Sequence, residues 1–204
     1  GHEAGQFAFV TVDASEGAHP YTIASAWDAQ RRQDKRLTFV IKALGDHTRE
    51  LPGRISPGTP VTVEGPYGRF TFAGEEKRQI WIGAGIGITP FIARMQALAS
   101  ERAEKGLPEE KIQIDLFHPV NLCPDEAREK LAADARAAGV HLHIMDSSRD
   151  ERLTGEKIRA RIPEWQNASV WFCGPADFGQ SLRADLTTHG LPPQAFHQEL
   201  FEMR

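Results

Sequence analysis

The sequence of 204 residues is poor in three features that mark specialised classes of protein. Its two cysteines, Cys123 and Cys173, lie far apart and outside any Cys/His array, which argues against a zinc site; reduced thiols are favoured, although a disulfide stays open. Positive charge is not in excess: 24 Lys and Arg against 28 Asp and Glu give a net charge of −4, which argues against a nucleic-acid binder that works by bulk charge. The longest apolar-looking run, residues 80–93, is broken by Gly, Thr and Pro and is too short for a membrane helix, and no secretory signal is visible.

The first third of the chain has the pattern of short strands. Hydrophobic residues make up 40% and charged residues 25%, an ordinary globular balance that suits one large domain or two small ones. Runs rich in β-branched and aromatic residues predict strands, and between them lie turn residues with no helix longer than a turn or two. The predicted strands are 5–12, 20–25, 37–43 and 60–65, with a short further piece at 69–72. The pattern predicts a small antiparallel barrel or sandwich.

The remainder alternates between buried strands and helices. Strands are predicted at 79–84, 112–118, 140–145, 169–174 and 195–201, and helices at 90–104, 124–139, 153–162 and 178–190. Such alternation is typical of a doubly wound parallel sheet, here of five strands. We therefore divide the chain into domains at residues 1–75 and 76–204.

Three glycines separate the first strand of the second domain from its helix. Gly83, Gly85 and Gly87 precede Thr89 and Pro90, where the helix begins. Glycines at such a turn let the backbone approach a ligand, and the helix N-terminus offers free N–H groups to a pyrophosphate. The alternative is a tight turn that needs glycine only for packing. We favour phosphate binding because the motif opens an α/β unit, although its spacing differs from the standard dinucleotide fingerprint.

Polar residues follow the third strand of this domain. Ser148 and Arg149 lie at its carboxyl end, where parallel sheets bind ligands, and a hydroxyl beside a guanidinium suits the 2′-phosphate of NADPH. Lys157 and Arg159 could add positive charge. The alternative is a solvated polar loop.

Cys173 ends the fourth strand, and Gly174 and Pro175 turn the chain into the next helix. A cysteine there is most often simply small and buried, and its functional alternative is contact with a nicotinamide ring. No neighbouring base in the sequence suggests a nucleophile.

The stretch from His19 to Ser25, HPYTIAS, mixes an aromatic residue, a hydroxyl and small residues. This is unusual for a half-buried strand, and the open question is whether it is core or a platform for a flat ligand.

Together these motifs resemble the ferredoxin-NADP reductase superfamily, and within it the dehydrogenase module of ferric reductases and NADPH oxidases. The resemblance covers nearly the whole chain, and the order and spacing of the motifs make it specific. The His-Pro pair before the aromatic residue is typical of the ferric reductase and oxidase branch. The matching residues are His19, Pro20, Tyr21, Thr22, Ser25, Gly45, Thr48, the GPYG turn at 65–68, residues 83–90, Ser148, Arg149, Cys173, Gly174, Pro175, Glu199 and Phe201.

The resemblance implies an FAD-binding barrel followed by an NADPH domain. The family barrel has six strands, so we expect two strands upstream of Gly5 and a barrel incomplete at its N-terminal side. Tyr21 would lie against the isoalloxazine, Thr22 would reach toward flavin N5, and Phe201 would cover the other face. The residues implied for the FAD pyrophosphate are His19, Gly45 and Thr48, and those implied to flank hydride transfer are Cys173 and Glu199.

The implied activity is hydride transfer from NADPH to FAD, with NADH less favoured, followed by single-electron transfer to an acceptor. That acceptor would be haem in a membrane domain of the same parent polypeptide, on the cytoplasmic side of the inner or plasma membrane, with this fragment itself soluble and without a metal site. A soluble flavin or ferric-chelate reductase is a variant of this hypothesis. A non-catalytic nucleotide-sensing or docking domain is the alternative from another class.

Overall fold

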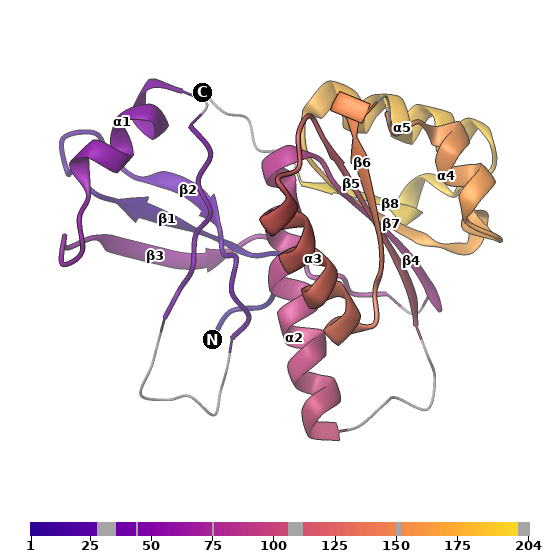
Figure 1. Ribbon diagram of the computed structural model, residues 1–204, viewed down its shortest axis with the longest axis horizontal. Coiled ribbons are helices and arrows are strands. Elements are labelled where there is room, and N and C mark those ends of the chain that lie inside the picture. Colours follow the sequence, from indigo (N-terminus) through magenta and orange to yellow (C-terminus); the bar gives the residue numbers. More distant parts are fainter. Residues whose placement is uncertain (28–35, 44, 75, 106–111, 150–151, 200–204) are drawn as a thin grey trace.

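The computed structural model describes residues 1–27, 36–43, 45–74, 76–105, 112–149 and 152–199. Within them the chain forms a small antiparallel sheet and a five-stranded parallel sheet covered by helices on both faces (Figure 1). The two-part fold predicted from the sequence is therefore confirmed.

The small sheet has three strands in the order β2-β1-β3: β1 is Phe7–Thr11, β2 is His19–Thr22 and β3 is Thr62–Tyr67. Both neighbours pair antiparallel with β1. Helix α1, Asp46–Arg54, lies beside this sheet (Figure 1). Its nine residues correct the expectation that this part has no helix longer than a turn or two. The helix forms because the Gly45 N–H donates to Thr48 Oγ1 at its start and Leu51 is buried.

Two predicted strands are absent from the described part of this sheet. Residues 37–43 make one isolated bridge, between Ile23 and Phe39, and the side chains of Leu37 and Val40 are exposed, so no ladder forms there. Residues 69–72 are not a strand, because Phe72 has a φ of 60° and its ring packs in a core.

The parallel sheet has the strand order β6-β5-β4-β7-β8. Its strands are β4 (Arg78–Gly83), β5 (Gln113–Val120), β6 (His141–Asp146), β7 (Ser169–Cys173) and β8 (Phe196–Glu199). The helices between them are α2 (Thr89–Lys105), α3 (Asp125–Ala138), α4 (Gly155–Arg161) and α5 (Ala176–Thr188). Each of these elements overlaps its predicted range, and the backbone of Gly139 ends α3 with a φ of 64°, as a glycine after a helix allows.

Helices α2 and α3 cover one face of the parallel sheet, and α4 and α5 cover the other (Figure 1). The first core includes Met95, Leu116 and Leu131, and the second includes Phe172, Ile158 and Leu186. The central strand β4 is hydrophobic without alternation because both of its faces are buried, which is typical of a parallel sheet.

Two phenylalanines connect the small sheet to the larger domain. The rings of Phe70 and Phe72 are almost fully buried and pack among Trp81, Phe91 and Trp171, with centroids 5.0–5.8 Å apart. They precede the boundary predicted at residue 75, so this segment of the first domain fills part of the core of the second. We refer to Phe70 and Phe72 as the aromatic plug.

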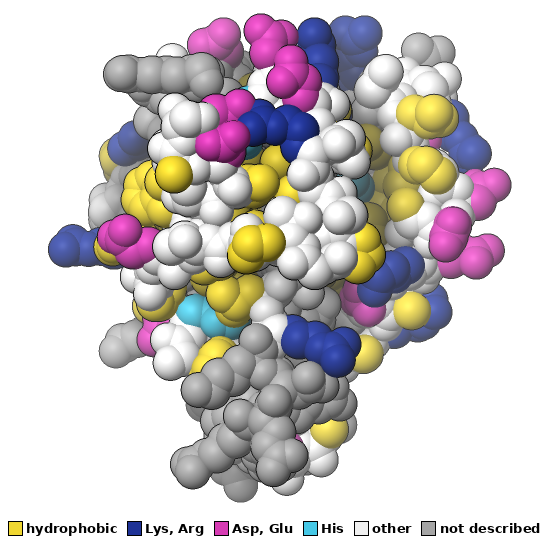
Figure 2. Space-filling view, turned by 90° about the vertical axis from the view of Figure 1, so that its left-hand side faces the viewer, with side chains coloured by type: hydrophobic (Ala, Val, Ile, Leu, Met, Phe, Trp, Pro, Cys, Tyr) yellow, Lys and Arg dark blue, Asp and Glu magenta, His cyan; other side chains and the backbone are white. Residues whose placement is uncertain are grey.

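The outer side of the small sheet is partly apolar. Every residue of β3 is exposed, and the neighbouring Val61 is 49% accessible. Figure 2 shows hydrophobic side chains across the middle of this side of the molecule. None of the described helices is both long and apolar enough to cross a membrane.

Candidate flavin and dinucleotide site

The order of the parallel strands creates a crevice between β4 and β7. From β4 the chain proceeds to β5 and β6 on one side, and β7 and β8 lie on the other side. Parallel sheets bind ligands at such a switch point, outside the carboxyl ends of the strands. Gly83 ends β4 directly beside Cys173, the last residue of β7, and the Ala84 N–H donates to the Cys173 carbonyl at 2.9 Å. The glycine loop and the Cys-Gly-Pro turn are thus brought together, as the resemblance implies.

Three glycines at this crevice are required by packing. A Cβ on Gly83 would lie 2.9 Å from the Cα of Ile88, and one on Gly87 would overlap the carbonyl of Cys173. A Cβ on Gly174 would lie 2.6 Å from that of Ala84. For these positions the packing interpretation of the motif accounts for the glycine.

Gly85 differs from its neighbours. It has a φ of 55°, and a Cβ placed there would meet nothing within 4 Å, so the space beside its backbone is open. It lies just before α2, whose first residues are Thr89 and Pro90, and Thr89 Oγ1 donates to the carbonyl of Ile86 at 2.7 Å. Gly85 is therefore the part of the loop with open space for a phosphate, while Thr89 and Pro90 at the start of α2 are buried.

A buried histidine that the sequence motifs do not mark supports this loop. His118 lies in β5, and its Nδ1 is 2.7 Å from the Gly83 carbonyl. Because a carbonyl only accepts, this nitrogen is the donor. Burial lowers the pKa of His118. A neutral imidazole therefore holds the end of β4.

The polar turn after β6 is organised by Asp146. Its Oδ1 accepts hydrogen bonds from the Ser148 N–H at 3.1 Å and from the Ser148 hydroxyl at 2.5 Å, and its Oδ2 accepts from Arg128 at 3.2 Å. The hydrogen bond from the Ser148 side chain, followed by those from the Cys123 and Ser148 N–H groups and by the charge of Arg149, lowers the pKa of Asp146. Arg149 is exposed next to them. The Ser148 hydroxyl, which the sequence predicts to hold a phosphate, thus donates its hydrogen bond to the Asp146 carboxylate. Arg149 is an exposed cation at this turn.

The two further cations predicted for this site have other partners. Lys157 Nζ donates to the carbonyl of Arg152 at 2.6 Å, and Arg159 forms an ion pair with Asp185 that links α4 to α5. Their role in binding NADPH stays a prediction.

Cys173 and Glu199 are neighbours at the ends of β7 and β8, where they are paired in register. Burial raises the pKa of Cys173 to about 12, with a further contribution from Glu199, so its sulfur is a thiol at neutral pH. Burial also raises the pKa of Glu199 to about 7, and its Oε2 has no hydrogen-bond partner among the described residues. This carboxyl can therefore exist in either protonation state near neutral pH.

Glu199 also lies against the small sheet. A Cβ on Gly68 would be 3.0 Å from Glu199 Oε1 and 3.2 Å from the ring of Phe7. Phe7 in β1 is the cross-strand partner of Thr22 in β2, so their side chains share one face. A chain of adjacent residues therefore connects Thr22 to Glu199 and Cys173, the three predicted to flank hydride transfer.

A cavity of about 220 Å³ opens beside Glu199, bounded by Arg69, Phe70, Trp171, His197 and Gln198. The His197 ring stacks on Trp171 with centroids 4.1 Å apart. A larger cavity of about 340 Å³ lies between α3 and β6, away from the ends of β4 and β7.

Tyr21 and His19 lie on the opposite face of β2 from Thr22, because their cross-strand partners are Ala8 and Val10. The Tyr21 hydroxyl is buried without a hydrogen-bond partner among the described residues, and burial raises its pKa. His19 Nε2 is likewise buried without a described partner.

Two other residues predicted for this stretch lie within β2 and beyond its end. Pro20 is exposed in the strand opposite Phe9, and Ser25 Oγ accepts from the Thr38 N–H at 3.1 Å. Phe201 lies outside the described residues.

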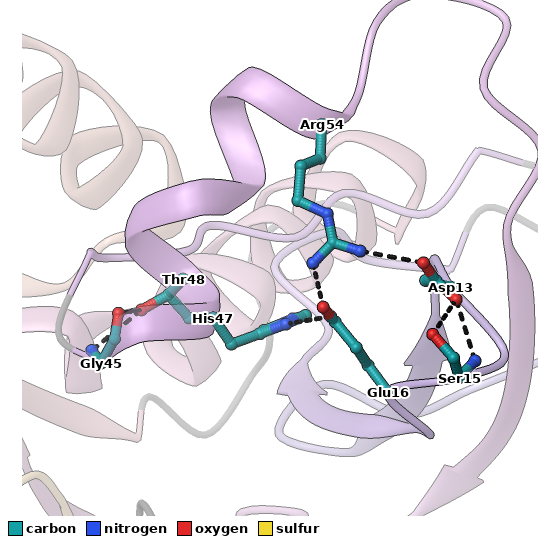
Figure 3. Close-up of polar contacts among 7 residues, drawn as sticks. All are labelled: Asp13, Ser15, Glu16, Gly45, His47, Thr48 and Arg54. Carbon is teal, nitrogen blue, oxygen red and sulfur yellow. Dashed lines mark hydrogen bonds and ion pairs between the residues drawn. The ribbon is translucent and has the colours of Figure 1, made fainter.

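The start of α1 forms a polar cluster with the loop before β2 (Figure 3). Gly45 and Thr48 are hydrogen-bonded to each other at the first turn of the helix. His47 Nδ1 lies 2.9 Å from Glu16 Oε2, and Arg54 forms an ion pair with the same carboxylate. The hydrogen bond from Arg54 lowers the pKa of Glu16. Gly45 and Thr48 thus lie at a helix N-terminus, as a pyrophosphate site requires, and His47 is an addition that the sequence motifs did not indicate.

Comparisons with known proteins agree with this architecture. Residues 1–71 match the family model of an FAD-binding domain. A flavohemoprotein of Burkholderia sp. (strain TH2) is 24% identical over 93% of this chain and 48% of its own length. NADPH oxidase 1 of Mus musculus is 30% identical over 89% of this chain and 38% of its own length. The chain thus spans about half the length, or less, of these curated relatives.

Solved structures share the fold across almost the whole chain. The flavohem-like FAD/NAD-binding domain of a nitric oxide dioxygenase from Vibrio cholerae covers 98% of this chain, and the match covers 85% of that one, with a TM-score of 0.71 and 18% identity. Ferredoxin-NADP⁺ reductase from Plasmodium falciparum covers 98% of this chain, and the match covers 84% of that one, with a TM-score of 0.72 and 14% identity.

The chain therefore has the fold of FAD/NAD(P)-binding modules like those of ferredoxin-NADP⁺ reductase, and its first 71 residues match an FAD-binding domain.

Proposed function

We propose that this chain takes a hydride from NADPH onto FAD and passes electrons singly to haem in a membrane domain of the ferric reductase and NADPH oxidase type. It would act on the cytoplasmic side of that membrane. The observation that carries the proposal is the adjacency of Thr22, Gly68, Glu199 and Cys173, where the small sheet meets the carboxyl ends of β7 and β8.

The residues of the small sheet fit a flavin. Two of its predicted ligands, His19 and Tyr21, each have a buried polar atom with no partner among the described residues. Such atoms cost about 1–3 kcal/mol unless a ligand pairs with them. Tyr21 would bind a flat ring, and Gly45 and Thr48 at the start of α1 would hold phosphate. FAD, when bound, supplies the capacity to accept a hydride and release electrons one at a time.

Cys173 would provide an apolar contact surface, and Glu199 would provide a proton that it can hold or release. The buried thiol, held in its neutral form, gives the small apolar surface against which a nicotinamide can stack. Glu199 would hold or release a proton next to this surface because its pKa is about 7. Gly68 leaves the room that Glu199 needs.

The preference for NADPH would rest on Arg149. Its guanidinium is exposed at the turn after β6, while Arg128 is hydrogen-bonded to the negative charge of Asp146 behind it. Guanidinium groups bind phosphate in a bidentate manner, which suits the 2′-phosphate that distinguishes NADPH from NADH.

The proposed acceptor is supported by two similarities. His19-Pro20 before Tyr21 resembles the ferric reductase and oxidase branch, and the mouse relative at 30% identity is an NADPH oxidase. The name of the flavohemoprotein relative includes haem, which supports haem as the acceptor proposed for this chain.

The flavin assignment is tested by retention. The purified chain is mixed with FAD, freed of excess, and examined for flavin absorbance and its loss on adding NADPH under argon. Y21A should retain much less FAD, and Y21F, which keeps the ring but loses the buried hydroxyl, should retain an intermediate amount. A chain that neither holds FAD nor consumes NADPH in excess FAD would refute the proposal and favour a nucleotide-docking domain.

The nucleotide assignment is tested separately. R149A should weaken NADPH binding about tenfold or more and leave NADH nearly unchanged, since one charge-assisted phosphate contact contributes on the order of 1.5–3 kcal/mol. R152A, which removes another exposed arginine close by, is the control. An equal loss for both nucleotides would exclude Arg149 as the 2′-phosphate ligand.

A further inference from the structure

The end of β4 and the end of β5 meet where the glycine loop begins. Their ladder is paired in register as far as Ile82, so its next step brings Gly83 opposite His118. Successive residues of a strand direct their backbone N–H and C=O groups to opposite neighbours. Because the Ala84 N–H donates to the Cys173 carbonyl in β7, the Gly83 carbonyl has to point the other way, toward β5.

The residue that would donate to this carbonyl in a regular ladder is a proline. A carbonyl opposite His118 in a parallel ladder accepts from the next residue of the partner strand, which is Pro119 and has no N–H. The His118 side chain takes over this bond, because its Nδ1 donates to the Gly83 carbonyl at 2.7 Å. His118 is only 5% exposed. The His118-Pro119 pair thus ends the backbone ladder and replaces its last hydrogen bond with one from a side chain.

Hydrogen bonds from two neighbouring strands hold the start of the glycine loop. The Gly83 carbonyl is bound to β5 through the histidine, and the Ala84 N–H is bound to β7 at 2.9 Å. The Gly87 N–H then donates to the Ala84 carbonyl at 3.0 Å and closes the turn. Between these bonds lies Gly85, the glycine with open space beside its backbone. The position of Gly85 therefore depends on where the Gly83 carbonyl is held.

We propose that His118 is a positioning residue for the dinucleotide, an inference that rests on the proposed function. It acts through the Gly83 carbonyl, not on the reacting atoms. Gly83 is buried, and a buried acceptor that loses its donor is costly, so without the imidazole the loop would shift to give this carbonyl another partner. Such a shift would move Gly85 away from the pyrophosphate. Because NADPH and NADH share the pyrophosphate, both should depend on His118 to the same degree.

The tautomer of His118 provides a first test, which needs no nucleotide. Burial lowers the pKa of His118, which favours the neutral ring. A neutral imidazole carries one proton, and the bond to Gly83 requires that proton on Nδ1. Nitrogen-15 NMR at neutral pH should therefore show a protonated Nδ1 and an unprotonated Nε2. The opposite tautomer would overturn the proposal, because Nδ1 could not then donate to the carbonyl.

The second test is calorimetric titration of matched variants with NADPH and with NADH. H118L removes the donor, H118N keeps an amide N–H at the place of Nδ1, and H118Q moves that amide one atom farther. H118L and H118Q should weaken both nucleotides about fivefold or more, which is the effect of losing one hydrogen bond. H118N should bind both within about twofold of the unaltered chain, because its donor is preserved. This pattern differs from that expected of R149A, which should weaken NADPH alone.

Hydrogen exchange shows whether the effect is local. Peptides that cover residues 83–90 should exchange faster in H118L and H118Q than in H118N, and peptides of α3 should exchange alike in all three. H118Q carries the test if H118L does not fold.

The outcomes separate this inference from the proposed function. Equal nucleotide binding by H118Q and the unaltered chain, or an equal loss in H118N and H118Q, would overturn the positioning role, since the second result would indicate packing alone. An unaltered chain that binds neither nucleotide would refute the proposed function itself.

Discussion

The buried carboxyl of Glu199 predicts a pH dependence of stability that E199Q should abolish. Burial raises its pKa from 4.5 to about 7 in the folded protein. A carboxyl whose pKa is raised on folding favours the folded state fully only below its unfolded pKa, where it is protonated in both states. That stability is lost as the pH rises through the folded pKa, in a window between about 4.5 and about 7.

The magnitude follows from the shift. At about 1.4 kcal/mol per pKa unit, the full penalty for ionised Glu199 is at most about 3 kcal/mol. Roughly 2 kcal/mol of this develops between about pH 5.5 and about pH 8.5. Because the side chain is only partly buried, we halve the figure and expect about 1 kcal/mol.

Urea unfolding at these two pH values measures the effect. The free energy of unfolding of E199Q, relative to that of the unaltered chain, should be about 1 kcal/mol larger at the higher pH than at the lower, which corresponds to about 2–4 °C in thermal midpoint. E129Q, at an exposed glutamate on α3, should show no such difference. If E199Q and the unaltered chain have the same pH dependence, Glu199 is not a buried titrating carboxyl.

Three other outcomes are expected. G87A should unfold the nucleotide domain or destabilise it by several kcal/mol in chemical denaturation, because its Cβ would overlap the Cys173 carbonyl. G85A, where space is open, should keep the fold and lose about 1–2 kcal/mol to its positive φ. It should also weaken nucleotide binding, as calorimetry would measure. Cys173 should react with iodoacetamide far more slowly than a free thiol until denaturant is added, since its pKa is about 12; rapid alkylation of the native chain, followed by mass spectrometry, would contradict this. F70A should cost about 3–5 kcal/mol in unfolding free energy, and a loss below 1 kcal/mol would mean that its ring is not part of the core.

The sequence predicted the parallel sheet better than the small sheet for a physical reason. Strands buried on both faces, such as β4, and helices with capping signals, such as α3 before Gly139, carry strong local patterns. Residues 37–43 have the composition of a strand, but pairing decides whether a strand forms, and here one bridge to Ile23 is all that the described residues provide.

The glycine motif shows the limit of prediction at the site. Gly83, Gly85 and Gly87 look equivalent in the sequence, yet only Gly85 has open space beside it, because the other two pack against Ile88 and Cys173. Asp146 was missed as the partner of the Ser148 hydroxyl because nothing in the sequence shows that its carboxylate accepts from that residue. Such roles depend on tertiary contacts that no local pattern encodes.

The sequence motifs indicated His19 and Glu199 as site residues, and their surroundings in the fold explain the properties of their side chains. The motif gave no reason for a pKa of about 7 at Glu199, which arises from its burial against Gly68 and β7. Likewise, the stacking of His19 on His47 joins residues 28 positions apart through the fold of α1 onto the small sheet.

The aromatic plug bears on how this chain can be divided. A nucleotide domain cut at residue 76 would lose Phe70 and Phe72 and expose parts of Trp81, Phe91 and Trp171 to water. The flavin part, separated in turn, would carry two large unpartnered rings, a surface prone to self-association. The two halves are therefore distinct in sequence but should melt as one cooperative unit, and a well-behaved isolated half has to begin before Phe70.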